Sequence, residues 1–347
     1  MSESNGHSMT RSFLVAPRQL KMETLPIPTP ADNQALIKVH SCALCTFEQR
    51  IYSGEEPHYP FAGGHEVSGT VVSKGRLVFG LAPGDHVALA GLVRCGQCES
   101  CRRGYDNVCE NMYAVQDPQG GPAGLGEYVL RTGADCFKIA PEVKLEHAAL
   151  AEPLACVLRS VKRAHLQAGE RVVIVGAGIM GLLHLQLAKR DNAVVIVSEP
   201  DAARQAKATA LGADHVFNPL EKDYVKTVKE LTGGRGADVT FICVAHTGTI
   251  EPAVIASAND GRVLLYSSFF PKGKKIEVDP NIFHKKEVVL SGTMSQTGQD
   301  FFEAAELISR RVLDFQPLIS ATYPLGQLET AFQVALTPGS YRVLVQP

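Results

Sequence analysis

The first part of the chain consists of short apolar runs separated by turns that are rich in glycine and proline. The runs fall at Phe13–Val15, Ala35–Val39, Val67–Val72, His86–Leu89 and Glu127–Leu130. Runs of this length between turn residues are typical of short β-strands. We therefore expect an irregular, mainly β domain over residues 11–155, preceded by a disordered tail at residues 1–10.

The pattern changes near residue 147, where helical and strand patterns begin to alternate. Residues His147–Leu166 predict a helix, with Pro153 near its start, where proline is tolerated. Strands are then expected at Val172–Val175, Val194–Val197, Val216–Phe217, Val239–Val244, Val263–Tyr266 and Val288–Gly292, and helices at about 179–190 and 201–211. This alternation predicts an α/β domain with a parallel sheet of βαβ units over residues 156–298.

The last segment, residues 299–347, is expected to return to the first domain. Two helical patterns, Phe301–Leu313 and Leu328–Leu336, are followed by a strand pattern at Tyr341–Val345. We expect this final strand to join the sheet of the mainly β domain.

Composition and charge narrow the function classes. The length of 347 residues suits two domains, and 45% hydrophobic with 20% charged residues is typical of a globular protein. The 34 Lys and Arg residues nearly balance the 36 Asp and Glu residues, so no general attraction to nucleic acid or an anionic membrane is expected. The polar N-terminus has no signal-peptide core, and no apolar run reaches the roughly 18–20 residues of a membrane span. We expect a cytoplasmic protein that acts on small molecules.

A glycine-rich turn directly after the strand at Val172–Val175 has the pattern G-x-G-x-x-G. The residues expected to contact a dinucleotide there are Gly176, Gly178, Ile179, Met180 and Gly181. The glycines allow a tight turn, a close approach of the backbone to a pyrophosphate, and close packing of the helix on the strand.

An acidic residue follows this turn at the expected distance. Glu199 ends the second strand, 23 residues after Gly176, where a carboxylate binds the ribose hydroxyls and repels a 2′-phosphate. This favours NAD over NADP. Arg204 can pack on the adenine or accept a 2′-phosphate, and it keeps NADP open.

The nine cysteines are an odd number in a chain without an export signal, which directs attention to metal chemistry rather than disulfides. Four of them form C-x2-C-x2-C-x7-C at Cys95, Cys98, Cys101 and Cys109. This spacing predicts a closed Zn–S4 site in a lobe at residues 94–111. An iron–sulfur cluster is the alternative, and it fits less well with the hydride chemistry that a dinucleotide site implies.

A second, open metal site is predicted from dispersed residues. Cys45, His65, Glu66 and Glu152 offer one thiolate, one imidazole and two carboxylates. One thiolate, one imidazole and one carboxylate would leave the fourth position of a tetrahedral zinc open for water or a substrate oxygen.

Taken together and in this order, the Cys45 segment, GHE at 64–66, the four-cysteine lobe, EPL at 152–154 and GAGIMG at 176–181 resemble the zinc-dependent medium-chain dehydrogenase/reductase family. The similarity is to its polyol (sorbitol-like) and threonine dehydrogenase-like branch. The resemblance implies a GroES-like catalytic domain, a Rossmann domain, and two zinc ions per chain. It also implies hydride transfer between a secondary alcohol and NAD, and a homo-oligomer. Which of Glu66 and Glu152 binds zinc directly is open.

The resemblance also implies roles for residues outside the metal ligands. Glu48 is expected to contact His65, and Arg342 to reach the cofactor pyrophosphate. Relatives carry a Ser or Thr two residues after the first zinc-binding cysteine, and often a histidine three further on, as a proton relay. Here those positions are Phe47 and Arg50, and the nearest hydroxyl belongs to Thr46.

Three explanations of the changed relay remain open: Thr46 replaces it, water held by a glutamate carries the proton, or catalysis has changed. The main hypothesis is an NAD-linked dehydrogenase of a polyol, sugar derivative or similar molecule. The alternatives are an NADP-linked ketone reductase and a non-catalytic protein that binds zinc and a dinucleotide.

Overall fold

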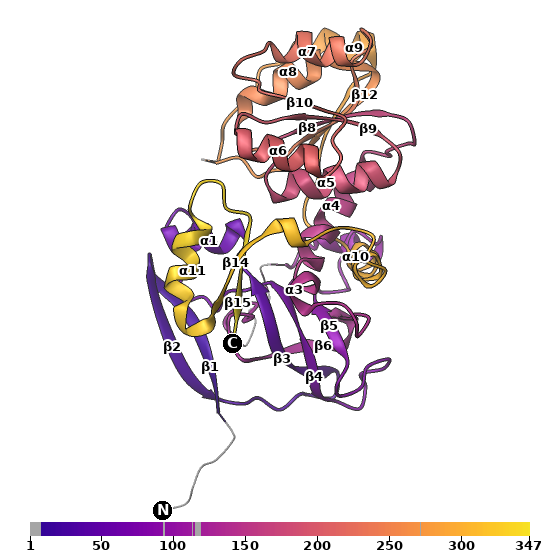
Figure 1. The fold of residues 1–347 in the computed structure, drawn as a ribbon. Helices are drawn as coiled ribbons and strands as arrows, with labels where there is room; N and C mark the ends of the chain where they lie inside the picture. The colour runs from indigo at the N-terminus through magenta and orange to yellow at the C-terminus, as the bar shows by residue number, and fades with distance from the viewer. Residues whose placement is uncertain (1–7, 93, 113, 115–118, 271) are drawn as a thin grey trace, which may run out of the picture. The chain divides into compact units, whose positions relative to one another are not determined.

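The chain crosses twice between two units. The computed structural model describes residues 8–92, 94–112, 114, 119–270 and 272–347. Unit 1 consists of Met1–Ala155 and Gln296–Pro347, and unit 2 of Cys156–Ser295 (Figure 1). Helix α4 (Ala151–Arg163) carries the chain into unit 2, and the chain returns at Gln296, slightly before the boundary expected from the sequence.

Unit 1 contains an antiparallel strand pair and a larger mixed sheet, in which β14 and β15 are parallel and the other neighbours antiparallel. Strand β1 (Ser8–Ala16) pairs with β2 (Gln19–Pro26). A larger sheet has the order β14-β15-β3-β4-β5-β7, with β6 also paired to β3. Its strands are β3 (Gln34–Ala43), β4 (Glu66–Lys74), β5 (His86–Leu89), β6 (Tyr128–Thr132), β7 (Cys136–Lys138), β14 (Ile319–Pro324) and β15 (Arg342–Gln346). The last strand, β15, pairs antiparallel with β3, so the described C-terminal segment lies in the sheet of this unit.

The expectation of a disordered tail at residues 1–10 is wrong for its last three residues. Residues 8–10 belong to β1, because Met9 buries its side chain (1% exposed) and the strand pairs with β2 from Ser8 onward. Residues 1–7 lie outside the described part of the chain.

The helices of unit 1 cover the sheet and connect it to the lobe and to unit 2. They are α1 (Thr46–Ser53), α2 (Glu99–Arg102), α3 (Leu145–Ala148), α10 (Gly298–Ser309) and α11 (Leu328–Ala335), with 3₁₀ turns η1 (Asp106–Val108), η2 (Gly133–Asp135), η4 (Gln316–Leu318) and η5 (Leu325–Gln327).

The single helix predicted at residues 147–166 is wrong in its limits, because the structure divides it into α3 and α4. Pro153 has no N–H to donate to the carbonyl of Ala149, so a continuous helix would lose a hydrogen bond at this point. At the other end, His165 adopts a φ of 48°, a left-handed conformation that ends the helix.

Unit 2 is a doubly wound parallel sheet with the order β10-β9-β8-β11-β12-β13, which confirms the predicted α/β class. The strands are β8 (Arg171–Val175), β9 (Val194–Ser198), β10 (His215–Phe217), β11 (Ala237–Ile242), β12 (Ser257–Leu265) and β13 (Val289–Gly292). The helices are α5 (Ile179–Arg190), α6 (Ala202–Ala210), α7 (Tyr224–Leu231), α8 (Ile250–Ile255) and α9 (Pro280–Lys286), with the turn η3 (Thr247–Thr249). Figure 1 shows α5 and α6 on one face of the sheet and α7, α8 and α9 on the other.

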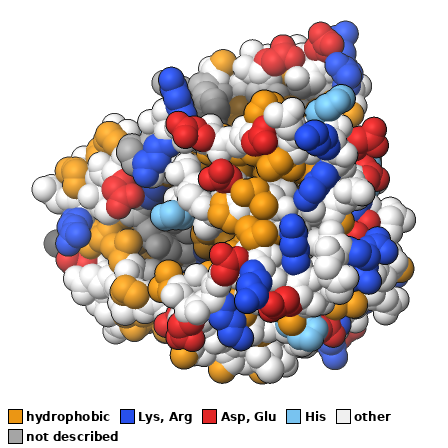
Figure 2. Space-filling model, turned by 90° about the horizontal axis from the view of Figure 1, so that it is seen from above, with side chains coloured by type: hydrophobic (Ala, Val, Ile, Leu, Met, Phe, Trp, Pro, Cys, Tyr) orange, Lys and Arg blue, Asp and Glu red, His pale blue; other side chains and the backbone are white. Residues whose placement is uncertain are grey.

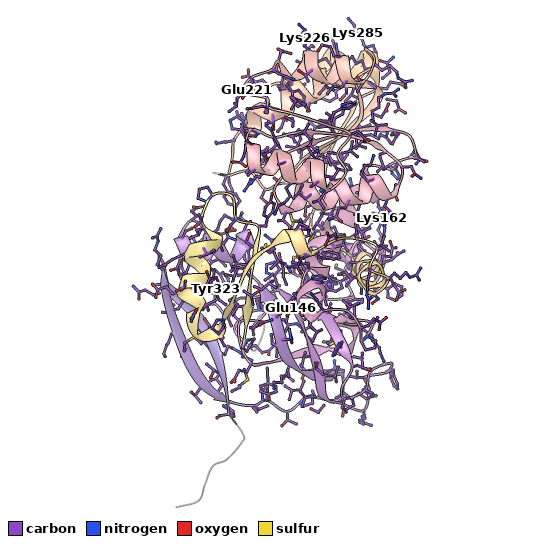
Figure 3. The ribbon with its side chains drawn as sticks, in the orientation of Figure 1. Glu146, Lys162, Glu221, Lys226, Lys285 and Tyr323 are labelled. Atoms are coloured by element: carbon purple, nitrogen blue, oxygen red, sulfur yellow. The ribbon has the colours of Figure 1, made fainter. Side chains whose placement is uncertain are left out.

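Charged side chains of both signs are dispersed over the surface. Figure 2 shows basic and acidic side chains interspersed on the face that it displays. Glu221, Lys226 and Lys285 are exposed side chains on unit 2 (Figure 3). Within the described residues, no helix is both long and apolar enough to cross a membrane.

Candidate active site and metal sites

The end of β3, an interior strand of the larger unit 1 sheet, brings three dispersed residues together. Ala43 at the end of β3 is paired with Glu66 of β4 on one side and with Leu344 of β15 on the other. Cys45 follows β3 by two residues, and Arg342 lies two residues before Leu344 on β15. The register of one strand therefore places Cys45, Glu66 and Arg342 in one neighbourhood.

His65 is held by Glu48 from helix α1. The Nδ1 atom of His65 lies 2.7 Å from Glu48 Oε1, and the same oxygen accepts a hydrogen bond from the amide of Gly64 at 3.0 Å. Burial acts to raise the pKa of Glu48, but the charge and hydrogen bond of His65 outweigh it, so the pKa is lowered. An ionised Glu48 fixes a proton of His65 on Nδ1, so Nε2 is the nitrogen that could bind a metal.

Gly64 is required by the close packing around His65. It adopts a φ of 98°, and a Cβ atom there would lie 2.7 Å from Cys42 Sγ and 2.7 Å from the amide nitrogen of Leu125. A side chain at this position would therefore displace the segment that carries His65.

Arg342 donates two hydrogen bonds to the carboxylate of Glu66 and contacts Cys45. Its Nε donates to Glu66 Oε2 at 2.8 Å, its Nη2 lies 2.5 Å from Glu66 Oε1, and the same nitrogen lies 3.6 Å from Cys45 Sγ. The side chains of Glu66 and Arg342 are 0% and 6% exposed. Burial opposes the charge of Arg342, but Glu66 and Cys45 outweigh it and raise the pKa of the guanidinium. The pyrophosphate contact implied for Arg342 stays a prediction, and its pairing with Glu66 is not visible in the sequence.

The remaining ligand candidates surround His65. Ligand atoms of Cys45, Glu48 and His65 lie within 4.8 Å of one another, and so do those of His65, Glu66 and Glu152. Burial raises the pKa of the Cys45 thiol, while the nearby Arg342 acts in the opposite direction. Thiolate, imidazole and carboxylate atoms at these separations are compatible with a zinc ion that keeps one open position.

Phe47 lies at the position where the resemblance implies a hydroxyl of the proton relay in relatives. The ring of Phe47 lies 6.1 Å from the ring of His65 and packs edge-on against Phe61 at 5.9 Å. Arg50 is paired with Glu56 at 3.2 Å, and Thr46 is exposed at the start of α1. The structure thus places an apolar side chain, and no proton acceptor, at position 47.

The four cysteines of the lobe converge as their spacing predicts. All four sulfurs of Cys95, Cys98, Cys101 and Cys109 lie within 4.8 Å of one another. Amides of the lobe donate to them, including Cys98 to Cys95 Sγ at 3.3 Å and Cys101 to Cys98 Sγ at 3.4 Å. Donors to sulfur stabilise the thiolate form, and hydrogen bonds from Asn111 and two amides lower the pKa of Cys95 to about 6. This donor set fits a closed tetrahedral zinc.

In unit 2 the glycine turn has the close contacts of a dinucleotide-binding loop. A Cβ atom on Gly181 would lie 1.9 Å from the carbonyl oxygen of Gly176, so only glycine allows α5 to start so close to β8. Glu199 is 4% exposed, and its carboxylate accepts from the amides of Ala177 at 2.6 Å and Asp201 at 3.0 Å. The guanidinium of Arg204 lies beside the same turn, 4.0 Å from a Cβ placed on Gly178. Turn, acid and arginine are therefore neighbours, and their roles in binding a dinucleotide stay predictions.

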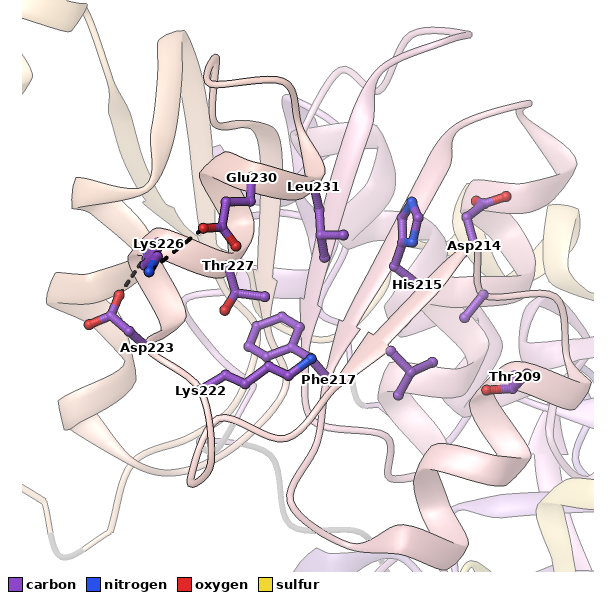
Figure 4. Close-up of a pocket in the computed structure, with 12 residues that line it drawn as sticks. Thr209, Asp214, His215, Phe217, Lys222, Asp223, Lys226, Thr227, Glu230 and Leu231 are labelled. Carbon is purple, nitrogen blue, oxygen red and sulfur yellow. Dashed lines mark hydrogen bonds and ion pairs between the residues drawn. The ribbon is translucent and has the colours of Figure 1, made fainter.

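A pocket of about 710 Å³ lies elsewhere, along β10 at the edge of the unit 2 sheet (Figure 4). It is lined by residues of α6, β10 and α7, and none of the predicted site residues is among them. Its Lys226 is already paired with Glu230. This pocket brings no candidate catalytic groups together.

Two families of known proteins match this chain, one in its first half and one mainly in its second half. A family described as alcohol dehydrogenase GroES-like domain matches residues 31–142, and one described as zinc-binding dehydrogenase matches residues 179–310. The chain is 30% identical to L-galactonate-5-dehydrogenase of Escherichia coli K12 over 91% of its length and 92% of that protein. It is 32% identical to L-threonine 3-dehydrogenase of Pyrococcus furiosus over 89% of each chain.

A solved structure shares the whole fold. The structure of a zinc-binding dehydrogenase from Sinorhizobium meliloti 1021, bound to NADP, has a TM-score of 0.92 and 29% sequence identity. It covers 99% of this chain and 100% of that one. The two matched families in this order, the length of the shared sequence and the common fold show that this chain belongs to the zinc-dependent medium-chain dehydrogenases.

Proposed function

We propose that the protein is an NAD(H)-linked dehydrogenase that interconverts a secondary alcohol of a polyhydroxylated small molecule and its ketone. Alcohol–ketone oxidoreduction follows from the family, and the substrate class and NAD preference are the finer parts of the proposal. The observation that carries the proposal is that two groups of candidate ligands in unit 1 share His65: Cys45 and Glu48 in one group, and Glu66 and Glu152 in the other. Relatives that are dehydrogenases of L-galactonate and L-threonine support a small hydroxylated substrate.

We further propose that Glu152 is the carboxylate that binds zinc directly. Both oxygens of Glu66 accept hydrogen bonds from the guanidinium of Arg342. Glu152, on the first turn of α4, offers a second carboxylate within 4.8 Å of the same histidine, His65. Glu66 would have to exchange a buried ion pair for the metal, and breaking such a pair is costly. Cys45, His65 and Glu152 would then hold zinc, and Glu66 would add negative charge beside it.

The side chains around His65 have separate tasks in the proposed reaction. When bound, zinc supplies a Lewis acid for the alcohol oxygen, and the nicotinamide ring supplies the hydride acceptor. Glu48 keeps His65 in the tautomer that presents Nε2. Arg342 holds Glu66 in place, and Phe47 presents an apolar ring beside His65 that excludes water.

The proton of the substrate hydroxyl needs a route that avoids position 47. Phe47 cannot accept a proton, and Arg50 is paired with Glu56. We propose that the hydroxyl of Thr46 relays this proton: it accepts the proton from the substrate side and releases its own to solvent, to which Thr46 is exposed. Thr46→Val should lower kcat and leave the KM for NAD unchanged, with Thr46→Ser as the matched control that keeps the hydroxyl. An unchanged kcat in Thr46→Val would exclude this route.

The proposed preference for NAD rests on Glu199. Its buried carboxylate stands beside the glycine turn, where the 2′-phosphate of NADP would meet a negative charge. Two observations favour NADP instead: Arg204 lies beside the turn, and the Sinorhizobium structure is bound to NADP. Initial rates with NAD and NADP at equal concentrations distinguish the two, and a higher rate with NADP would overturn this part of the proposal.

The two glutamates can be separated by matched variants. Glu152→Gln should lose one zinc per chain and nearly all turnover, scored as NADH formation with a panel of polyols, hydroxy acids and threonine. Glu66→Gln should keep its zinc and lower the rate less. Zinc loss in Glu66→Gln alone would reverse the assignment. A wild-type protein that binds NADH and zinc but turns over no member of the panel would instead support the non-catalytic alternative.

A further inference from the structure

The four-cysteine lobe is tied to the segment by which the chain returns from unit 2. Arg94, which precedes the first cysteine, pairs with Asp106 Oδ2 at 3.0 Å and with Asp135 Oδ1 at 3.2 Å. Its Nη2 also donates to the carbonyl oxygen of Gln296 at 3.2 Å. Gln296 is the first residue of unit 1 after the return, and it is 0% exposed. One guanidinium therefore joins the start of the lobe to the point of return.

The other end of the lobe reaches the same segment through Asp106. This residue begins the turn η1, and its carbonyl accepts from the amide of the lobe ligand Cys109 at 3.2 Å. Its carboxylate oxygen Oδ2 accepts from the amide of Gly298 at 3.2 Å. Gly298 is the first residue of α10. Residues next to both ends of the cysteine cluster thus hold residues 296–298.

The return segment has a conformation that needs such an anchor. Ser295, the last residue of unit 2, has a φ of 50°, which is unfavourable for a residue with a side chain. The capping box between Thr297 and Asp300 closes the first turn of α10 internally, so it does not attach the segment to the rest of unit 1. Further along α10, the ring of Phe301 packs against that of Phe137, with the centroids 4.6 Å apart. Before Phe301, the contacts of Arg94 and Asp106 attach the return segment to the rest of unit 1.

The position of these two residues depends on the cysteine cluster. Helix α2, at the centre of the lobe, has no buried residue, so apolar packing contributes little to its order. A metal bound by the four cysteine sulfurs would fix the conformation of the lobe in place of apolar packing. We propose that metal bound by the four cysteines fixes the return segment 296–298 through Arg94 and Asp106, so that metal occupancy of the lobe sets the freedom of the connection between the units. The inference rests on the proposed zinc of the lobe and not on the catalytic site.

Hydrogen exchange of the zinc-loaded full chain, measured by mass spectrometry, tests the coupling. In Asp106→Ala and Arg94→Met, the peptide over residues 294–301 should exchange faster by roughly ten- to a hundredfold, the factor that a charge-assisted hydrogen bond contributes to an equilibrium. Both variants should keep the zinc content of the wild type. Cys98→Ser should lose one zinc and show the same local increase. Arg76→Met, which breaks the exposed pair with Asp32 in the same unit, is the matched control and should change nothing at 294–301.

The outcomes separate the inference from the proposed function. Wild-type exchange at 294–301 in both Asp106→Ala and Arg94→Met would overturn the coupling, even if Cys98→Ser failed to fold. Loss of zinc in Cys98→Ser with wild-type exchange at 294–301 would overturn it while leaving the lobe zinc intact as a proposal. An unchanged zinc content in Cys98→Ser would overturn both the coupling and the lobe zinc, and would leave the catalytic site untouched.

Discussion

The buried ion pair of Arg342 and Glu66 should contribute several kcal/mol to the free energy of unfolding. Removing Arg342 should therefore test whether this pair holds Glu66 in place. Arg342→Met keeps the length of the side chain but leaves the carboxylate of Glu66, which is 0% exposed, without its two hydrogen bonds. Removing one partner of a buried ion pair costs about 3–5 kcal/mol. We therefore expect Arg342→Met to lower the free energy of unfolding of unit 1 by about that amount.

A double-mutant cycle isolates the pair from other effects of the substitution. Urea unfolding of Arg342→Met, Glu66→Gln and the double variant should give a coupling free energy of about 3 kcal/mol, because the double variant leaves no uncompensated charge. The exposed pair of Arg76 and Asp32 is the control, and its coupling should stay below about 1 kcal/mol. A coupling below about 1 kcal/mol for Arg342 and Glu66 would refute the claim that Arg342 holds Glu66 in place and with it the reason for assigning zinc to Glu152.

Three further predictions follow from single residues. Burial lowers the pKa of His184 to about 4. Below pH 6.5 this side chain is therefore protonated in the unfolded chain while it stays neutral in the native chain. Stability is then fully present above pH 6.5 and falls by about 2 kcal/mol by pH 5, a loss that His184→Leu should largely abolish in urea unfolding. Glu199→Ser should raise the KM for NAD at least about tenfold and lower that for NADP, and unchanged steady-state constants would contradict the role of the carboxylate. Gly64→Ala should lower the zinc content by about one ion per chain, because its Cβ would collide with Cys42 and displace His65; full zinc content would show that the segment tolerates the side chain.

Much of the fold follows from local pattern. The strands of unit 2 carry β-branched residues between turn signals and alternate with helices, so a parallel sheet could be predicted from the sequence. The helix predicted at 147–166 has the wrong limits, because apolar periodicity continues across Pro153 while the backbone hydrogen bonds do not. Strand β2 was missed, since its side chains are half-exposed and leave no apolar run.

Some residues of the candidate sites could be predicted from the sequence to lie together, and others could not. Cys95, Cys98, Cys101 and Cys109 are close in sequence, so spacing alone predicts that their sulfurs converge. The pairing of Arg342 with Glu66 joins residues 276 positions apart, and only the register of β15 and β4 on β3 brings them together. The sequence shows only a charged residue before three apolar residues in the final strand, which does not identify Glu66 as its partner.

The central claim is that Cys45 contributes to a catalytic zinc separate from the zinc of the lobe. The most direct test is the zinc content and turnover of Cys45→Ser beside the wild type, by elemental analysis and NADH formation. The wild type should hold about two zinc ions per chain. Cys45→Ser should keep about one, bound by four sulfurs in X-ray absorption, and should lose turnover. A Cys45→Ser protein that kept both zinc ions and full turnover would contradict the account.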